Sequence, residues 1–272
     1  MINMIIVKTP GINGLGKTKG TRNAGNKIIE ELKKISVNEK GEEIDIVNIE
    51  IEEIHVNNEN LKEQEELVYE NALETMGRQD KCVFIGGDHS ISYSIGRAFL
   101  DSCRNENKTH CLIVFESHAD CMHSLKEPTH EEWLRALVEK GFPVGNILIV
   151  GLRKVEKQEM EFLVKNKIRI IRMNELNNNL EETTDVLMEF ANGKELYVSI
   201  DIDVVEPAHA PAVAYPEAGG LTARQMIYIA SRIGMMKNLR VFDLVEIDSE
   251  KDNQTGNMTI KLAAKLVGEM IA

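Results

Sequence analysis

Short apolar runs alternate with longer stretches of helical pattern along the 272-residue chain. The run Ile147-Leu148-Ile149-Val150 is apolar at every position. Such a run is typical of a strand that is buried on both faces in a parallel sheet covered by helices. Strict alternation of strand and helix predicts an α/β fold. A three-layer α/β/α sandwich is favoured over an eightfold barrel, although eight strands fit both.

The expected elements follow this alternation. Strands are predicted at residues 4–8, 44–51, 81–85, 111–115, 146–152, 167–173, 195–200 and 239–246. Helices are predicted at residues 23–35, 61–76, 90–100, 130–140, 155–165, 180–191, 222–233 and 257–271. No repeat, low-complexity tract or linker divides the chain, so we expect residues 1–272 to form a single domain.

Composition restricts the possible partners. A formal net charge of −12 argues against nucleic acid and anionic membrane surfaces, because both need a basic footprint. We expect no membrane span and no secretory leader, since no apolar run is long enough for either. Four cysteines show no metal-binding spacing, namely Cys82, Cys103, Cys111 and Cys121. Reduced thiols and a cytoplasmic location are therefore expected.

Three potential metal ligands follow the apolar run at residues 111–115. Glu116, His118 and Asp120 occupy alternate positions, and alternate side chains of an extended strand point to one side. Carboxylate and imidazole together suit a divalent first-row ion. A polar strand end exposed in a loop is the alternative interpretation of this run taken alone.

Two further segments offer similar ligands. Asp201 and Asp203 follow the run at residues 195–200, and His89 follows Gly86-Gly87-Asp88. Ligands gather at the carboxyl ends of parallel strands, where we expect all six side chains to meet. The set is rich in oxygen and lacks thiolates, which favours Mn²⁺ or a similar ion over structural zinc. Two ions sharing carboxylates would use all six ligands and would activate a water as nucleophile.

The motifs that contain these residues resemble the ureohydrolase family of arginase and agmatinase. They are Gly86-Gly87-Asp88-His89-Ser90, the Glu116-x-His118-x-Asp120 run, the segment from Ser199 to Thr222, and Asp243-Leu244-Val245-Glu246. The resemblance implies a three-layer α/β/α fold with a central, mostly parallel eight-stranded sheet. It also implies hydrolysis of a guanidino or amidino C–N bond in a small cationic compound, usually with release of urea. Two Mn²⁺ ions per chain, a metal-bridging hydroxide and a homo-oligomer, either trimer or hexamer, complete what the resemblance implies.

The same resemblance assigns roles by position. One ion would be held by His89 and Asp120 and the other by His118 and Asp203, with the residues at 116 and 201 bridging the two. Asp203 would also orient the attacking hydroxide. Glu246 would pair with the substrate guanidinium, and His130 would carry protons to the leaving amine.

Several residues depart from the family pattern. Glu116 stands where the family has aspartate, so the occupancy of one metal position is in question. Tyr215 brings a phenol close to the substrate pocket, Glu156 can receive an amine, and Met122 offers no hydrogen bond to a carboxylate. Arginine is therefore not supported as the substrate, and Lys154 is consistent with an acidic one. Two hypotheses remain: a dinuclear manganese hydrolase, or a catalytically impaired relative that binds or regulates with altered metal occupancy.

Overall fold

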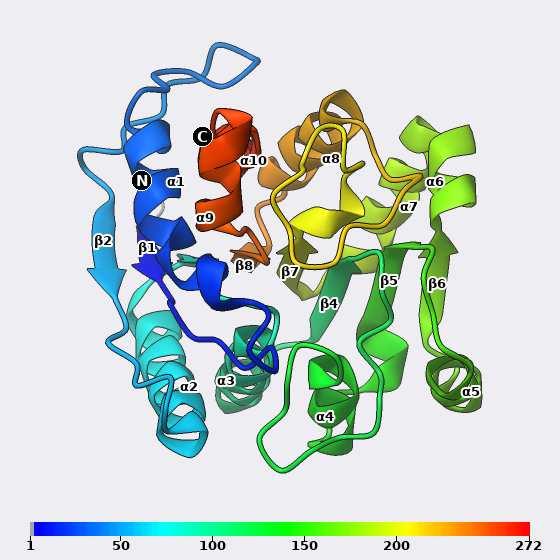
Figure 1. Ribbon diagram of the computed structural model, residues 1–272. Coiled ribbons are helices and arrows are strands. Elements are labelled where there is room, and N and C mark those ends of the chain that lie inside the picture. Colours follow the sequence, from blue (N-terminus) through cyan, green and yellow to red (C-terminus); the bar gives the residue numbers. More distant parts are fainter. Residues whose placement is uncertain (1–2) are drawn as a thin grey trace.

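The computed structural model describes residues 3–272, which contain one eight-stranded, all-parallel sheet (Figure 1). The strand order is β2-β1-β3-β8-β7-β4-β5-β6. The strands are β1 (Met4–Lys8), β2 (Glu50–Glu53), β3 (Lys81–Ile85), β4 (His110–Phe115), β5 (Ile147–Leu152), β6 (Arg169–Arg172), β7 (Glu195–Asp201) and β8 (Leu239–Val245). Because the sheet has two open edges, β2 and β6, the structure is a sandwich and the barrel is excluded.

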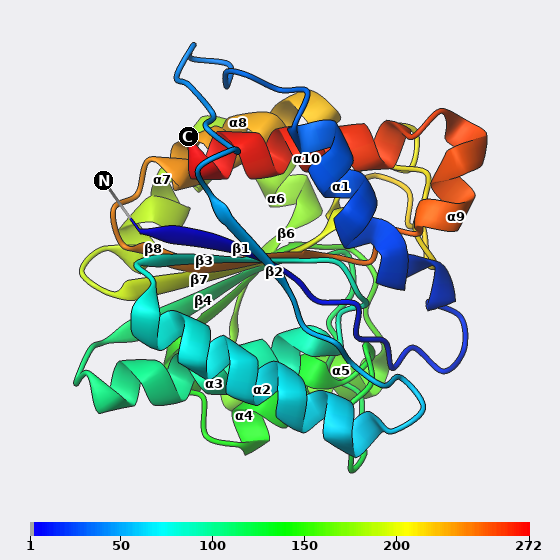
Figure 2. The same ribbon diagram turned by 90° about the vertical axis from the view of Figure 1, so that its left-hand side faces the viewer.

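Helices cover both faces of the sheet (Figure 2). One face carries α2 (Leu61–Arg78), α3 (Ile91–Asn105), α4 (Trp133–Glu139) and α5 (Lys157–Asn166). The other carries α1 (Ala24–Leu32), α6 (Met173–Asn178), α7 (Leu180–Ala191), α8 (Ala223–Gly234) and α10 (Met258–Ile271), and the four-residue α9 (Ser249–Asp252) precedes α10. The three-layer α/β/α fold predicted from the sequence is thereby confirmed. Among residues 3–272, no helix is long and apolar enough to cross a membrane.

The two-sided burial of the central strands explains their continuous apolar runs. In β4, Ile113 and Phe115 pack into the core beneath α1, α8 and α10, whereas Leu112 and Val114 pack into the core beneath α2, α3 and α4. Each face of the sheet is covered by helices and therefore takes apolar residues from every second position of the strand. The strand is consequently apolar at consecutive positions.

The predicted strand at residues 44–51 is the main error in the secondary structure. Strand β2 covers only Glu50–Glu53, and the preceding residues form a loop. Ile44 and Ile46 are apolar because this loop packs them into the core, where they are 5% and 7% exposed. The short α6 was also missed, because its first residue was included in the predicted strand at 167–173.

The sheet order brings four strand ends together. The strands β3, β8, β7 and β4 are consecutive neighbours in the sheet. They are all parallel, so their carboxyl ends lie at one edge, where α/β proteins form their ligand sites. His89, Glu246 and Glu116 lie in the segments that follow β3, β8 and β4, and Asp201 is the last residue of β7.

Candidate metal centre

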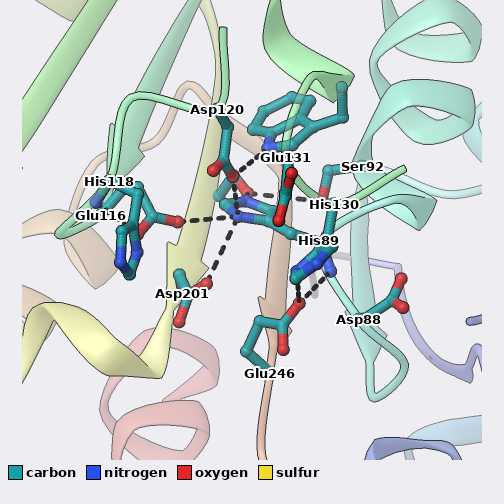
Figure 3. A network of polar contacts seen from close by, with 12 residues as sticks. Asp88, His89, Ser92, Glu116, His118, Asp120, His130, Glu131, Asp201 and Glu246 are labelled. Carbon is teal, nitrogen blue, oxygen red and sulfur yellow. Dashed lines mark hydrogen bonds and ion pairs between the residues drawn. The ribbon is translucent and has the colours of Figure 1, made fainter. Parts of the chain in front are cut away.

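A tight glycine turn positions His89. Gly86 and Gly87, which follow β3, have φ values of 95° and 78°, a region that L side chains rarely adopt. A Cβ atom on Gly87 would lie 2.4 Å from the carbonyl oxygen of Gly11. The turn directs His89, which is fully buried, toward the carboxylates that follow β4 and β7 (Figure 3).

A hydrogen-bond chain fixes which nitrogen of His89 faces these carboxylates. The Nε2 atom lies 2.9 Å from Ser199 Oγ, and the Ser199 hydroxyl donates to Asp243 Oδ1 at 2.8 Å. The Asp243 carboxylate also accepts from the hydroxyls of Ser92 and Tyr197. Since the Ser199 proton points to Asp243, the serine oxygen accepts from Nε2–H. The Nδ1 lone pair of His89 is left for a metal ion.

Glu116 lies between two imidazoles. Its Oε2 atom is 2.9 Å from His89 Nδ1, and its Oε1 atom is 3.2 Å from His118 Nδ1. The backbone N–H of His118 also donates to Oε1 at 2.8 Å. Potential ligand atoms within 4.8 Å of one another form two groups, His89–Glu116–Asp201 and Glu116–His118–Asp203. Glu116 is the member that the two groups share.

The two aspartates at the end of β7 are arranged by a turn of 3-10 helix at Ile202–Val204. Asp201 caps this turn, since its Oδ1 atom accepts the backbone N–H of Asp203 at 2.8 Å. Asp203 Oδ2 lies 2.8 Å from His118 Nδ1 and accepts the Ser117 hydroxyl at 2.7 Å. The Asp-x-Asp spacing therefore directs one carboxylate to each ligand group.

The expected alternation of Glu116, His118 and Asp120 on one strand face is wrong. Strand β4 ends at Phe115, and Asp120 has a left-handed φ of 48°. Asp120 belongs to neither three-residue ligand group. Its Oδ2 atom instead accepts Trp133 Nε1–H at 2.9 Å and lies 3.0 Å from His89 Nδ1. A turn beyond the strand, rather than the pleat, brings these side chains together.

The buried charge at the site favours a cation. Burial and the nearby Asp203 carboxylate raise the pKa values of Glu116 and Asp201. Burial opposes a charged His89 ring, but hydrogen bonds to Asp120, Asp201 and Glu116 raise its pKa well above the ordinary value. Four carboxylates that share so little solvent need positive charge nearby. A divalent ion would meet this need, and the residues present offer it mixed oxygen and imidazole ligands.

A cavity of about 500 Å³ opens beside these groups. It is lined by candidate residues from the sequence, namely His118, Asp120, Met122, His130, Glu156, Asp201, Asp203, Tyr215 and Glu246. Lys154, noted above for its charge, also lines it. Val213 and Ala214, from the segment that carries Tyr215, also line it, whereas sequence reasoning missed Glu131, Glu159, Pro216 and Glu217. Proximity in sequence to His130, Glu156 or Tyr215 was the only signal that could have indicated them.

Glu246 and His130 face each other in this cavity. Glu246 has a φ of 65°, and its Oε1 atom accepts the backbone N–H of His89 at 2.9 Å and lies 3.3 Å from His130 Nδ1. Burial raises the pKa of Glu246 to about 7, although His130 opposes this rise. Burial works against a charged His130, but Glu246 raises its pKa to about 9. The pair therefore holds a proton near neutral pH.

This fold and site define an α/β/α protein with carboxylate and imidazole ligand groups at the carboxyl ends of a parallel sheet. The family model described as "Arginase family" matches residues 3–272, and the chain belongs to this family.

Curated relatives have moderate identity to the chain. An arginase from Xenopus laevis, "Arginase, non-hepatic 1", is 29% identical over 74% of this chain and 62% of its own length. An agmatinase from Bacillus subtilis is 30% identical over 69% of this chain and 61% of its own length. The chain thus spans less than two thirds of these relatives.

Solved structures show the same fold. Proclavaminate amidino hydrolase from Streptomyces clavuligerus superposes with a TM-score of 0.87 at 21% identity, covering 99% of this chain and 90% of that one. Formimidoylglutamase from Bacillus subtilis superposes with a TM-score of 0.88 at 18% identity, covering 99% and 86% of the two chains.

Proposed function

We propose that the chain is a dinuclear manganese hydrolase that cleaves a guanidino or amidino C–N bond, releasing urea from guanidino substrates. The observation that supports this most is the position of Glu116, whose two oxygens each face a different imidazole and join two ligand groups. The family membership agrees, since its curated relatives include an arginase and an agmatinase.

Each ion would have one imidazole and several carboxylates as ligands. His89, Asp120, Asp201 and Glu116 would hold the first ion, and His118, Asp203, Asp201 and Glu116 the second. Two such ions would lower the pKa of a bound water and would so supply a nucleophile near neutral pH.

The chain's own residues would orient the substrate and move protons. Glu246 would receive the amidinium through charge-assisted hydrogen bonds. Burial opposes ionisation of Asp203, but hydrogen bonds from His118 and Ser117 lower its pKa to about 2. An ionised Asp203 can accept a hydrogen bond from the attacking oxygen and so hold that oxygen in line. A protonated His130 would then donate to the leaving nitrogen as the C–N bond breaks.

The test uses purified protein incubated with Mn²⁺. We expect two ions per chain by metal analysis, and release of urea or formamide from some member of a panel of guanidino and formimino compounds. The proposal is rejected if no member of that panel is hydrolysed by protein that holds two ions.

A catalytically impaired binding or regulatory protein is the second candidate, and the longer Glu116 side chain is the observation that favours it. In that case the metal analysis would return fewer than two ions per chain, and turnover would be absent. Robust turnover by the purified protein excludes this candidate.

We further propose that residues 1–272 act as one domain in a cytoplasmic homo-oligomer, either trimer or hexamer. Four buried free cysteines are consistent with a reducing compartment. Light scattering coupled to size-exclusion chromatography would measure the mass of the assembly, and a monomer would contradict the proposed oligomer.

A further inference from the structure

Two buried polar atoms in the cavity lack a partner among residues 3–272. They are the hydroxyl of Tyr215 and the Nε2 atom of His130. The two rings lie 5.3 Å apart between centroids, and both side chains line the cavity. A buried polar atom without a hydrogen bond destabilises the folded chain, so such atoms beside a cavity indicate a ligand that satisfies them.

The segment that carries Tyr215 is held in place at both ends. Lys251 Nζ donates to the Val213 carbonyl at 2.9 Å, and the Arg153 guanidinium donates to the Glu217 carbonyl at 2.7 Å. The phenol is therefore positioned before any ligand arrives, which reduces the entropy that binding would cost.

A lysine from the first loop lies over the phenol. The Lys17 ammonium is 5.1 Å from the centroid of the Tyr215 ring, a cation–π distance. Its loop is anchored on buried Asp88, whose Oδ2 atom accepts the Thr18 hydroxyl at 2.6 Å and the Asn13 backbone N–H at 2.8 Å. Lys17 is thus brought to the site by a defined turn.

Lys154 lines the cavity and Lys17 lies over the Tyr215 ring, and both cations lack a carboxylate partner among residues 3–272. Neither Lys17 nor Lys154 forms an ion pair within the described part of the chain. By contrast, Arg153 is committed to the backbone carbonyls of Asp203, Val204, Glu217 and Ala218. A phenol donor and two unpaired ammonium groups together suit an anionic oxygen ligand.

The carboxylates in the cavity are partly committed to other contacts. Glu159 accepts the backbone N–H groups of Cys121 and Glu156 at 3.0 and 2.8 Å, and Glu246 faces His130. Glu131, Glu156 and Glu217 make no ion pair within residues 3–272 and would attract an ammonium group instead. A compound that ends in an ammonium is therefore the direct competitor.

We propose that Tyr215, with Lys17 and Lys154, binds a carboxylate of the substrate, so that the compound hydrolysed is a short guanidino or amidino carboxylic acid. The inference rests on the proposed hydrolase function. The chain of the substrate is short because Tyr215 lies next to His130, which itself contacts the glutamate proposed to hold the amidinium. In this arrangement Tyr215 is a specificity-determining residue.

Three compounds with one four-carbon chain on the guanidine test the inference. They are 4-guanidinobutanoate, which ends in a carboxylate, agmatine, which ends in an ammonium, and butylguanidine, which ends in a methyl. With Mn²⁺-loaded protein we expect the lowest KM for 4-guanidinobutanoate. We expect Tyr215→Phe to raise this KM about tenfold or more, with little change in kcat. The KM for butylguanidine should change less than about twofold, because this compound cannot use the hydroxyl.

A binding measurement keeps the inference separate from the proposed function. Titration calorimetry measures the affinity of the metal-loaded protein for 4-guanidinobutanoate. We expect the variants Tyr215→Phe and Lys154→Met to bind this compound more weakly than the unsubstituted chain. The control Tyr228→Phe, whose hydroxyl contacts Arg232 on α8, should bind it with unchanged affinity. Binding should also perturb the near-ultraviolet tyrosine spectrum of the unsubstituted chain but not that of Tyr215→Phe.

The outcomes separate the two ideas. Acid-selective binding that depends on Tyr215, without hydrolysis of any compound, supports the carboxylate site and rejects the hydrolase. Hydrolysis with a preference for agmatine, or an equal effect of Tyr215→Phe on all three compounds, overturns the carboxylate site and leaves the hydrolase intact.

Discussion

Glu116 uses the full length of its side chain. One oxygen lies 2.9 Å from His89 Nδ1 and the other 3.2 Å from His118 Nδ1. An aspartate on the same backbone would be one methylene shorter, and side chains at metal sites tolerate errors of only about 0.5 Å. The surroundings are therefore arranged around glutamate rather than strained by it.

We predict that Glu116→Asp weakens Mn²⁺ binding roughly tenfold or more, because the shorter carboxylate reaches only one imidazole. Titration calorimetry with Mn²⁺ measures the affinity and the number of ions. The exposed substitution Glu181→Asp on α7 serves as the control. Tighter binding by Glu116→Asp would mean that the longer side chain is a defect.

His110, at the start of β4, is a polar residue in an apolar environment. Its ring lies edge-on to Phe99 and Phe142, and neither ring nitrogen makes a hydrogen bond of normal geometry among the described residues. Burial lowers its pKa, and the nearby Lys108 backbone offsets this only in part. Burial of the neutral His110 ring without hydrogen bonds therefore lowers the free energy of unfolding, and burial of the charged ring would lower it further.

We predict that His110→Leu raises the free energy of unfolding by about 1–3 kcal/mol at neutral pH. The pKa of the folded state lies below the ordinary 6.5, so the unfolded chain binds the extra proton and stability falls as pH drops below about 6.5. The variant should lose this part of the pH dependence. Urea denaturation between pH 5 and 8 measures both effects, with the exposed His55→Leu as control, and a less stable variant would contradict the prediction.

At the scale of elements, one buried arginine joins two helices to the sheet. Arg240 in β8 donates to the Met76 carbonyl in α2, to the Ser102 hydroxyl in α3 and to the Glu106 carboxylate just after α3. Its side chain is 7% exposed, whereas Glu106 is 36% exposed. The hydrogen bond from Arg240 is the main cause that lowers the pKa of Glu106 to about 2.

We predict that Glu106→Gln lowers the free energy of unfolding by about 1 kcal/mol, a value reduced because the carboxylate is partly solvated. The pKa of Glu106 is depressed on folding, so its contribution is present above about pH 4.5 and is lost as pH falls toward about 2. Thermal melts at pH 7 and pH 3 measure the difference, with the exposed Glu70→Gln as control. If the variant and the parent differ in stability by the same amount at pH 7 and at pH 3, the ion pair is not the cause of the difference.

At the scale of the whole molecule, the candidate metal centre brings together residues at the carboxyl ends of β3, β4 and β7, which are far apart in sequence. Ions bound there would hold these segments together only in the folded chain. Ligands that bind the folded state alone stabilise it by mass action.

We predict that Mn²⁺ raises the melting temperature and that a chelator reverses the rise. At an ion concentration of 100 Kd, each ion contributes about 2.7 kcal/mol. Differential scanning calorimetry with and without Mn²⁺ measures this effect, and His118→Ala should retain at most the contribution of one ion. A melting temperature that does not respond to Mn²⁺ would contradict the proposed metal centre.

The fold and the candidate ligands could be predicted because each depends on local pattern. Apolar runs mark the central strands, and His89, Glu116 and Asp201 follow such runs directly. Seven of the predicted strands correspond to observed ones within two residues at each end, and the exception, 44–51, failed because its apolar residues pack from a loop.

The rest depends on contacts between distant segments. Lys17 makes a cation–π contact with Tyr215, and the Arg153 guanidinium donates a hydrogen bond to the Glu217 carbonyl. No periodicity encodes such pairs, because loop conformations set them. Ser199 is different, since it lies two residues before Asp201 on β7, and strand alternation could have placed it beneath the site.

The left-handed backbone at Glu246 has a consequence for the evolution of this chain. Its φ of 65° is one that glycine or asparagine adopts more readily, at a saving of about 1 kcal/mol. Its carboxylate is also buried at a raised pKa. A laboratory selection for heat resistance alone would therefore favour replacement of this residue. Replacement would also remove the carboxylate proposed to receive the amidinium, so stability and the proposed function make opposite demands on this residue.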